Sequence, residues 1–361
     1  MIPVEKCQRI ERYLQRKEER EGKIRQFFLD DKPGFLILQD PPTEVWKNCN
    51  TIPDIVKHNL SGLDDFLAND WSDNLPYLEP WIGTGVFANA FGSPYYWREG
   101  EAPHAEYVYH KIDELADITP PLWQASEVMR MVLDAIDALK DATDGQIPIC
   151  LTDTQSPYDT ATLILDASEF FTACYTAPEI VHRFLHMITD LIIEFSQIQA
   201  QRIGSDLWAR PGHLIPSIPG LPGIAVSDDN LAVASPRINR DFSLPYLARI
   251  GEAFDGIAVH SCGTYVHSMP MLSHNPHTMA MEMAIAPQCD PNPNPPEQVR
   301  DADIAPNVIL KARVGAGSDM LETIRRFVRP DRKIIIQLPY SEENAREQYE
   351  QTRALLETLY G

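Results

Sequence analysis

The feature that most constrains the fold is an alternation of short apolar runs with segments of helical periodicity through the second half of the chain. Each run is short enough for a buried strand, and Gly, Pro, Asn or Asp residues stand near most of their ends. Strands that alternate with helices in this way imply a parallel sheet. The expected strands are residues 147–151, 206–208, 224–226, 256–259, 278–283, 307–312 and 333–337, and residues 34–39 form a similar run near the start.

About eight such strands favour a closed barrel over an open dinucleotide-binding sheet, because no Gly-x-Gly-x-x-Gly motif follows the first run. A barrel of this kind takes ~250 residues, and the chain has 361. The sequence therefore predicts an α/β fold, a (β/α)8 TIM barrel with an N-terminal helical extension. We expect residues 1–75 to form the extension packed on the barrel and residues 76–361 to form the barrel, as a single domain overall.

The clearest helix is expected over residues 178–203, where apolar side chains recur at helical spacing along one stripe. Thr176 and Glu179 have the spacing of a capping box at its start, and Gly204 is typical of a helix end.

Charge and hydropathy exclude two classes of partner. The chain has 31 Lys and Arg against 52 Asp and Glu, a formal net charge of −21, whereas nucleic-acid binders need a basic face. No apolar run approaches the ~18 residues that a membrane-spanning helix requires, and the charged start does not resemble a signal peptide. We expect a cytoplasmic protein that binds neither nucleic acid nor membrane.

His260 and Cys262 are the sharpest chemical signal. They follow the expected strand at residues 256–259, and residues two apart on an extended chain point the same way. An imidazole and a thiolate facing the barrel mouth together suit Zn²⁺, although an ordinary strand end with a buried Cys fits the same pattern. A catalytic zinc needs a third protein ligand, and Cys289 and Glu282, both on the next strand–loop unit, are the candidates.

Other polar residues also follow expected strands, where barrel enzymes place their chemistry. Asp228 and Asp229 are candidates for acid–base work or for holding a cation, but a capped, solvated turn explains them equally well. Asp153 is a further candidate catalytic residue. The candidates for substrate binding are Gln155, Tyr158, Arg210, His213 and Tyr340.

Several motifs together resemble the uroporphyrinogen decarboxylase superfamily. They are Leu-Thr-Asp-Thr-Gln-Ser-Pro-Tyr-Asp-Thr from residue 151, Val-Ser-Asp-Asp from 226, Ser-Pro-Arg from 235, Leu-Pro-Tyr-Leu from 244 and His-Ser-Cys-Gly from 260. Within this superfamily the chain is most similar to the zinc-dependent, corrinoid-linked methyltransferases of the methylcobalamin:coenzyme M type. The resemblance runs from about residue 75 to the C-terminus and implies a (β/α)8 barrel.

The resemblance also implies a chemistry. In the methyltransferase branch a His-x-Cys pair and a distant Cys hold zinc, which binds an acceptor thiol, and the methyl group comes from a corrinoid on a partner protein. His260 and Cys262 match the pair, but Leu338-Pro339-Tyr340 stands where the branch has its remaining Cys. Cys289 or Glu282 would then substitute as the ligand.

Three functions therefore stay open. The first is a zinc-dependent methyltransferase that moves a methyl group between a corrinoid protein and a thiol or related small-molecule acceptor. The second is a metal-independent decarboxylase of the uroporphyrinogen type, acting on an unknown carboxylated substrate with Asp228 or Asp153 as the charge stabiliser. The third is a non-catalytic barrel that binds a small molecule or a corrinoid partner. The arginine-rich N-terminal motif of the decarboxylases is absent from residues 1–80.

Overall fold

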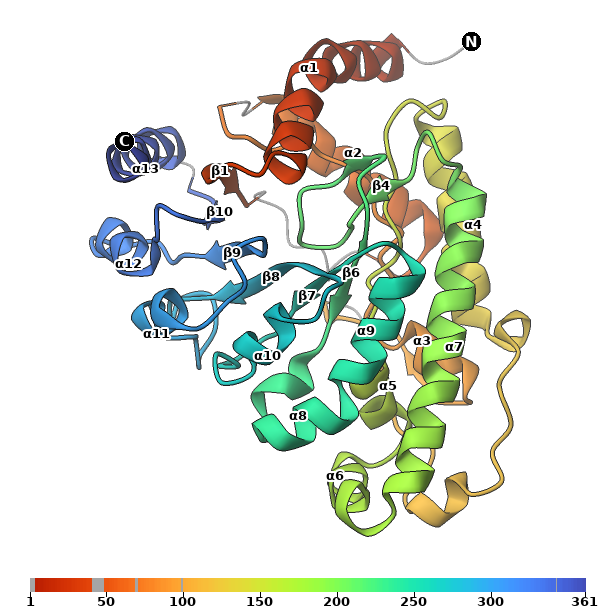
Figure 1. Ribbon diagram of the computed structural model, residues 1–361. Helices are drawn as coiled ribbons and strands as arrows, with labels where there is room; N and C mark the ends of the chain where they lie inside the picture. Colours follow the sequence, from red (N-terminus) through yellow and green to blue (C-terminus); the bar gives the residue numbers. More distant parts are fainter. Residues whose placement is uncertain (1–3, 41–48, 69–70, 99, 342) are drawn as a thin grey trace.

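The computed structural model describes residues 4–40, 49–68, 71–98, 100–341 and 343–361. Its strands and helices alternate through the second half of the chain, as the sequence predicts (Figure 1). In order, the elements are α1 (Val4–Leu29), β1 (Gly34–Gln39), α2 (Ile52–Ala68), α3 (Val86–Ala90), β2 (Tyr95–Tyr96), β3 (His104–Ala105), η2 (Ile112–Leu115), η3 (Trp123–Ala125), α4 (Glu127–Ala142), α5 (Pro157–Ile164), α6 (Ala167–Thr176), α7 (Pro178–Ile203), β4 (Ala209–Arg210), β5 (Ile218–Pro219), β6 (Ile224–Ser227), η4 (Asp229–Ala232), α8 (Pro236–Phe242), α9 (Leu244–Ala253), β7 (Ile257–His260), α10 (Met269–Ser273), β8 (Thr278–Ala284), α11 (Pro296–Asp301), β9 (Ile309–Arg313), α12 (Met320–Phe327), β10 (Lys333–Leu338) and α13 (Ala345–Tyr360).

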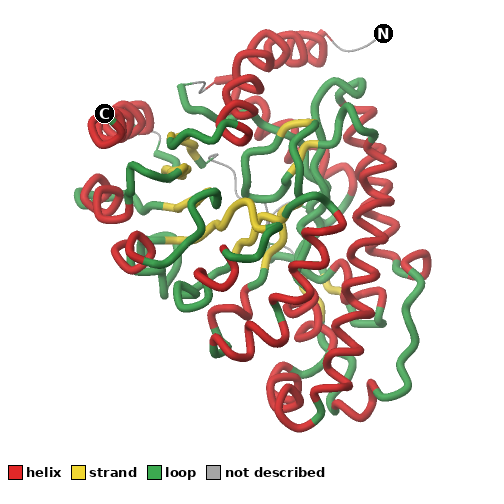
Figure 2. The backbone as a smooth tube through the Cα atoms, in the orientation of Figure 1, coloured by secondary structure: helices red, strands yellow, loops and turns green. Residues whose placement is uncertain are grey.

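Six parallel strands form the central sheet in the order β1-β10-β9-β8-β7-β6. Their side chains are almost all buried, as expected for parallel strands that are covered on both faces. The strands lie at the centre of the molecule and the helices lie outside them (Figure 2).

Single-residue parallel bridges continue the sheet from β6 back towards β1. Gln155 bridges to Ser227 at the end of β6, and Leu78 bridges to Ile149. On the other side, the Asp73 amide donates to the Ile37 carbonyl of β1 at 2.9 Å. The segments around residues 73–78 and 149–155 therefore occupy the two remaining positions of an eight-membered ring. The expected α/β barrel architecture is confirmed, with two of its eight positions filled by bridged segments rather than by regular strands.

Three details of the sequence prediction were wrong. Residues 147–151 form bridges through Ile149 and not a strand. The strand expected at residues 206–208 is reduced to a parallel bridge from Trp208 to Ile149, and the two residues of β4 that follow pair with β5. The capping box at Thr176 does not form: Ala177 is the N-cap of α7, and the Thr176 hydroxyl donates to the carbonyl of Thr172 inside α6. The preceding helix ends only two residues before α7 begins, so Thr176 belongs to α6.

The N-terminal segment is integrated with the barrel. Helix α1 packs on it through Tyr13, whose hydroxyl donates to the Pro76 carbonyl at 3.0 Å, and through Arg25, which donates to the Pro219 carbonyl at 2.7 Å. Strand β1 pairs with β10 along its whole length. Residues 1–75 therefore supply one barrel strand as well as the helices that flank it.

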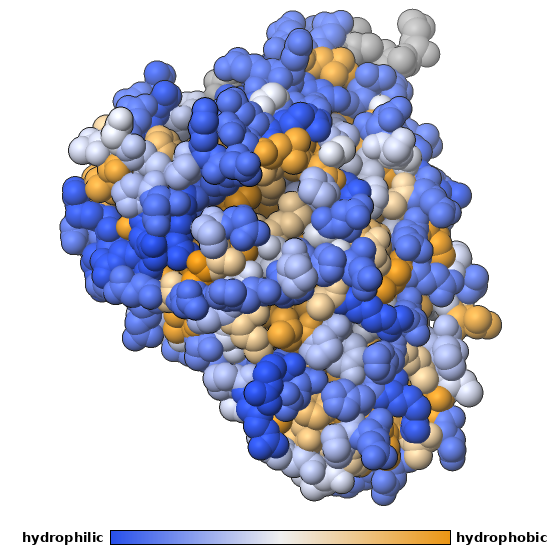
Figure 3. Space-filling model, in the orientation of Figure 1, coloured by the Kyte–Doolittle hydropathy of each residue, from blue (hydrophilic) through white to orange (hydrophobic). Residues whose placement is uncertain are grey.

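The surface is largely polar. The face drawn in Figure 3 is mostly hydrophilic, with small hydrophobic patches between hydrophilic side chains and one of them in a hollow in its upper part. Among the described residues, no helix is both long and apolar enough to cross a membrane.

Candidate metal centre at the carboxyl end of the barrel

Strands β6 and β7 position the centre of the site. They pair so that Ser227, the last residue of β6, lies opposite His260, the last residue of β7. The next residues of both strands therefore enter the mouth of the barrel side by side. Gly263, with a φ of +71°, turns the chain away after Cys262, and its amide donates to Asp290 Oδ2 at 2.7 Å.

Three potential metal ligands converge at this point. His260 Nε2 lies 3.4 Å from Cys262 Sγ and 3.6 Å from Asp229 Oδ1, and one ligand atom from each of the three residues lies within 4.8 Å of the others. Ligands bound at about 2.0–2.3 Å to a tetrahedral Zn²⁺ are themselves about 3.3–3.8 Å apart. The nitrogen, sulfur and oxygen donors thus fit three corners of a zinc site. Cys262 and Asp229 are exposed, which leaves the fourth corner accessible.

Glu282 on β8 orients the imidazole of His260. Its Oε2 accepts a hydrogen bond from Nδ1, so Nε2 is the nitrogen with a free lone pair. Glu282 is fully buried, and its Oε1 lies 2.8 Å from Arg313 Nε and 3.5 Å from Lys311 Nζ on β9. Burial alone would raise the pKa of Glu282, but the charges of Lys311, His260 and Arg313 outweigh burial and lower it. A permanently ionised carboxylate therefore holds the ring, as carboxylates do behind metal-bound histidines.

Asp159 on α5 holds the turn that presents Asp229. Its two carboxylate oxygens accept from the amides of Asp229, at 2.6 Å, and Asn230, at 2.8 Å. Asp228 is fully buried beside it and accepts from the Ser243 hydroxyl at 2.6 Å. Burial, opposed by this hydrogen bond, raises the pKa of Asp228 to about 7. Asp228 therefore faces the interior, whereas Asp229 faces the mouth.

Neither residue proposed from the sequence as third ligand joins the cluster. Glu282 binds the opposite nitrogen of His260, and Cys289 is not part of the group that converges among the described residues. Partial burial of each sulfur raises the pKa of Cys262 to about 12 and that of Cys289 to about 11. Both thiols are thus protonated in the metal-free protein, and a bound metal would have to deprotonate Cys262.

A second polar cluster surrounds His213. Its Nδ1 lies 2.7 Å from Glu79 Oε1, and its Nε2 lies 4.0 Å from Asp153 Oδ2. Burial would lower the pKa of His213, but the two carboxylates outweigh it and raise the pKa to about 9. Gln155 belongs to the same cluster, because its Nε2 donates to Asp153 Oδ1 at 3.1 Å. His213, Asp153 and Gln155 are therefore brought together, as the sequence predicts for residues lining one mouth.

The remaining substrate-binding candidates lie apart from this cluster and from one another. Tyr158 has no exposed surface and packs against Phe170 in the core. Arg210 donates to the carbonyls of Gly223 and Phe254 and lies over Trp208, so its guanidinium holds the barrel wall together instead of facing a ligand. Both side chains are thus engaged within the protein, and their role in substrate binding stays a prediction. Tyr340 lines a cavity at the end of β10.

Three residues of these clusters were missed by the sequence analysis. Glu79 lies in a segment without clear periodicity and Asp159 lies at a helix start, where a carboxylate is unremarkable. Lys311 did carry a signal, because it interrupts an otherwise apolar run at a position that a parallel strand buries.

The fold and this polar cluster define a class of protein, an α/β barrel with a cluster of polar groups at the carboxyl ends of its strands, where barrel enzymes place their sites. A family model described as uroporphyrinogen decarboxylase (URO-D) matches residues 83–208. The curated uroporphyrinogen decarboxylase of Xanthomonas campestris is 25% identical over 173 residues, which are 46% of this chain and 43% of that protein. That of Xylella fastidiosa is 23% identical over 176 residues, 47% of this chain and 44% of that protein. The resemblance to the uroporphyrinogen decarboxylase superfamily is thereby confirmed, although the chain spans less than half the length of these curated relatives.

A solved structure extends the likeness to nearly the whole fold. A methyltransferase from Methanosarcina mazei superimposes with a TM-score of 0.61 over 95% of this chain and 99% of that chain, at 13% sequence identity. At this identity the likeness shows the shared fold.

Proposed function

We propose that the protein is a zinc-dependent methyltransferase that moves a methyl group between a corrinoid carried by a partner protein and a thiol or related acceptor. The observation that carries the proposal is the convergence of Asp229, His260 and Cys262 with donor spacings suited to a tetrahedral metal. The methyltransferase of M. mazei, which shares the fold, supports the same reading.

Asp229 Oδ1, His260 Nε2 and Cys262 Sγ would hold the metal, and its open position would receive the acceptor. A bound Zn²⁺ lowers the pKa of a thiol and keeps it nucleophilic near neutral pH. The corrinoid protein that carries the methyl group would approach from the exposed side, where Asp229 and Cys262 reach the surface.

The residues of this chain then have separate tasks. Glu282 fixes the tautomer and the orientation of His260, while Lys311 and Arg313 keep Glu282 ionised. Asp159 fixes the backbone that carries Asp229. These contacts pre-organise the ligand set before the metal binds, which lowers the cost of ordering it.

Metal analysis of the purified protein tests the proposal. We expect about one zinc per chain, lost largely in His260→Ala, and thiol-dependent demethylation of a methylated corrinoid by the wild-type protein but not by His260→Ala. His267→Ala is the matched control, because His267 is exposed and its Nε2 contacts only the Ala234 carbonyl. A wild-type chain that takes up no added zinc would refute the proposal.

A carboxy-lyase of the uroporphyrinogen type is the second candidate, favoured by the names of the curated relatives. It needs no metal, and Asp153, which is buried beside His213, would act as its charged group. Release of CO₂ from a porphyrinogen by metal-free protein, unaffected in His260→Ala, would support this candidate against the methyltransferase.

A further inference from the structure

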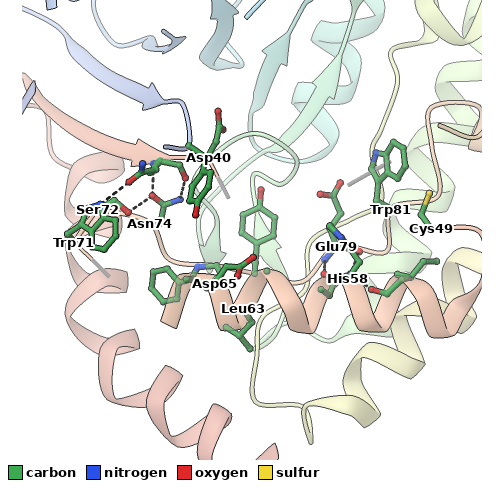
Figure 4. Close-up of a pocket in the computed structure, with 18 residues that line it drawn as sticks. Asp40, Cys49, His58, Leu63, Asp65, Trp71, Ser72, Asn74, Glu79 and Trp81 are labelled. Carbon is green, nitrogen blue, oxygen red and sulfur yellow. Dashed lines mark hydrogen bonds between the residues drawn. The ribbon is translucent and has the colours of Figure 1, made fainter. Parts of the chain in front are cut away.

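A separate cavity opens at the same end of the barrel as the metal centre, at the carboxyl ends of β1 and β10. Its volume is about 210 Å³, and helix α2 forms one side of it. Figure 4 shows His58 and Asp65 on that helix, with Asp40, Glu79 and Trp81 on the segments that face it. Drug-sized ligands occupy pockets of about 300–1,000 Å³, so this cavity suits a smaller molecule.

Negative charge and aromatic surface dominate the lining. Three carboxylates contribute to it, from Asp40, Asp65 and Glu79, and no Lys or Arg is among the described residues that line it. The aromatic lining residues are Phe66, Trp71, Tyr77, Trp81 and Tyr340. Carboxylates attract a cation, and aromatic rings stabilise it further, most strongly where water is excluded.

The one histidine of the lining does not offset this charge. Burial lowers the pKa of His58, and its buried Nδ1 has no hydrogen-bond partner among the described residues. His58 is therefore neutral at physiological pH and offers an unsatisfied polar atom to a ligand.

A metal ion does not explain the cavity. In the part of the chain that the structure describes, only Asp229, His260 and Cys262 bring their ligand atoms together within 4.8 Å. The carboxylates of Asp40, Asp65 and Glu79 are spread around the cavity and do not meet at one point. A spread of charge with aromatic rings between suits an organic cation, whose charge is distributed over several carbon atoms.

The wall around Trp71 is held in place without a ligand. Trp71 Nε1 donates to Gln39 Oε1 at 2.8 Å, and Asn74 Oδ1 accepts from the Gln39 amide at 2.8 Å and from the Ser72 hydroxyl at 2.6 Å. A pre-organised wall of this kind saves the ordering cost that binding would otherwise carry.

Two lining residues, Glu79 and Asp40, connect the cavity to the polar groups at the mouth of the barrel. Glu79 binds His213, which lies 4.0 Å from Asp153. Burial raises the pKa of Asp40, against the charges of Lys311 and Arg313, and a cation beside Asp40 would favour its ionised form. The cavity and the metal centre thus belong to the same end of the barrel.

We propose that this cavity binds a small organic cation of the alkylammonium class, held by Asp40, Asp65 and Glu79 and by the aromatic side chains between them. The proposal adds to the function proposed above the charge of the small substrate. That the bound cation is a substrate rests on the proposed function; that the cavity binds it does not. Binding itself requires neither zinc nor a corrinoid.

Calorimetry on the full chain tests the proposal with choline and its uncharged isostere 3,3-dimethylbutan-1-ol. We expect choline to bind about tenfold more tightly than the isostere, which corresponds to a difference of about 1.4 kcal/mol in binding free energy. One cation–π contact and one carboxylate contact, which only choline can make, suffice for this difference. Asp65→Asn and Trp81→Leu should each weaken choline binding and leave the isostere unchanged. Glu322→Gln, which removes an equal charge from the exposed surface of α12, is the matched control.

The same titration on His260→Ala separates this inference from the proposed function. Choline binding that persists in His260→Ala supports the cavity whatever the zinc content. Equal affinity for choline and the isostere, or no choline binding to a chain that holds zinc, would overturn the inference and leave the methyltransferase proposal standing.

Discussion

The two nitrogens of His260 face opposite partners: Nδ1 is hydrogen-bonded to the buried carboxylate of Glu282, and Nε2 lies 3.4 Å from the sulfur of Cys262. A single ring therefore joins the charged interior of the barrel to its mouth. Because Glu282 is itself paired with Lys311 and Arg313, the orientation of His260 depends on three neighbouring strands, β7, β8 and β9.

The first prediction concerns the third zinc ligand. Asp229→Asn should lower zinc affinity by more than the about 10–100-fold that loss of an outer-shell partner costs, because a neutral amide replaces a ligand. Cys289→Ser should leave the affinity unchanged, since Cys289 lies outside the converging group. Competition with a chromophoric chelator measures both affinities. If Cys289→Ser lost the metal and Asp229→Asn kept it, the ligand set would be the one expected from the sequence.

Much of this site follows from local sequence, and the rest depends on distant contacts. The spacing of His260 and Cys262 predicts two side chains on one side of a strand end, and both lie beside each other. Asp229 was recognised as a polar group at a strand end, but its place beside His260 depends on Asp159, 70 residues earlier, which binds its backbone. No periodicity encodes such a contact.

In the fold, too, some elements are predictable from local sequence and others depend on distant contacts. The strands with uninterrupted apolar runs, such as β1 and β10, appear at the predicted residues within one or two positions. The positions around Leu78 and Ile149 are held by single bridges, which leave no pattern of their own. Thr176 has the sequence of a cap, but the close approach of α6 and α7 decides its partner.

A second prediction concerns the stability of the buried ionic network. Glu282→Gln should destabilise the protein by about 3–5 kcal/mol, because it leaves the buried Lys311 and the half-buried Arg313 without their counter-charge. Urea unfolding monitored by tryptophan fluorescence measures the change. Glu297→Gln is the matched control, since Glu297 pairs with Arg326 at the surface and its loss should have no measurable effect. Equal effects of the two substitutions would contradict a buried role for Glu282.

The third prediction is a pH dependence of stability that arises from His213. Its pKa is raised to about 9 in the folded protein, from 6.5, so the folded state binds the proton more tightly than the unfolded chain. The contribution of His213 to the free energy of unfolding is complete below pH 6.5 and declines as the pH rises towards 9. Its full size is at most about 3 kcal/mol.

Unfolding free energies measured from pH 6 to pH 10 check this dependence. His213→Gln should flatten the decline between pH 6.5 and 9, because the titrating group is gone. His274→Gln serves as the control, as His274 is exposed and contacts no carboxylate in the described structure. A decline of the same size in His213→Gln would show that another group is responsible.

The fourth prediction concerns close packing beneath the barrel strands. Gly256 has a φ of +152°, and a Cβ there would lie 2.8 Å from Met279 Cγ and 3.3 Å from Gly223 Cα. Gly256→Ala should therefore destabilise the protein, by about 1–3 kcal/mol for overpacking and further for a backbone conformation that alanine disfavours.

Gly22 provides the opposite case for the same substitution. It lies inside α1, and a Cβ there meets nothing within 4 Å. Gly22→Ala should raise stability by about 0.5–1 kcal/mol, because alanine is the better helix former. Thermal unfolding of the two variants and the wild-type protein shows whether stability falls in Gly256→Ala and rises in Gly22→Ala. A neutral Gly256→Ala would mean that Met279 moves aside freely, and the packing between β6, β7 and β8 would then be looser than the structure indicates.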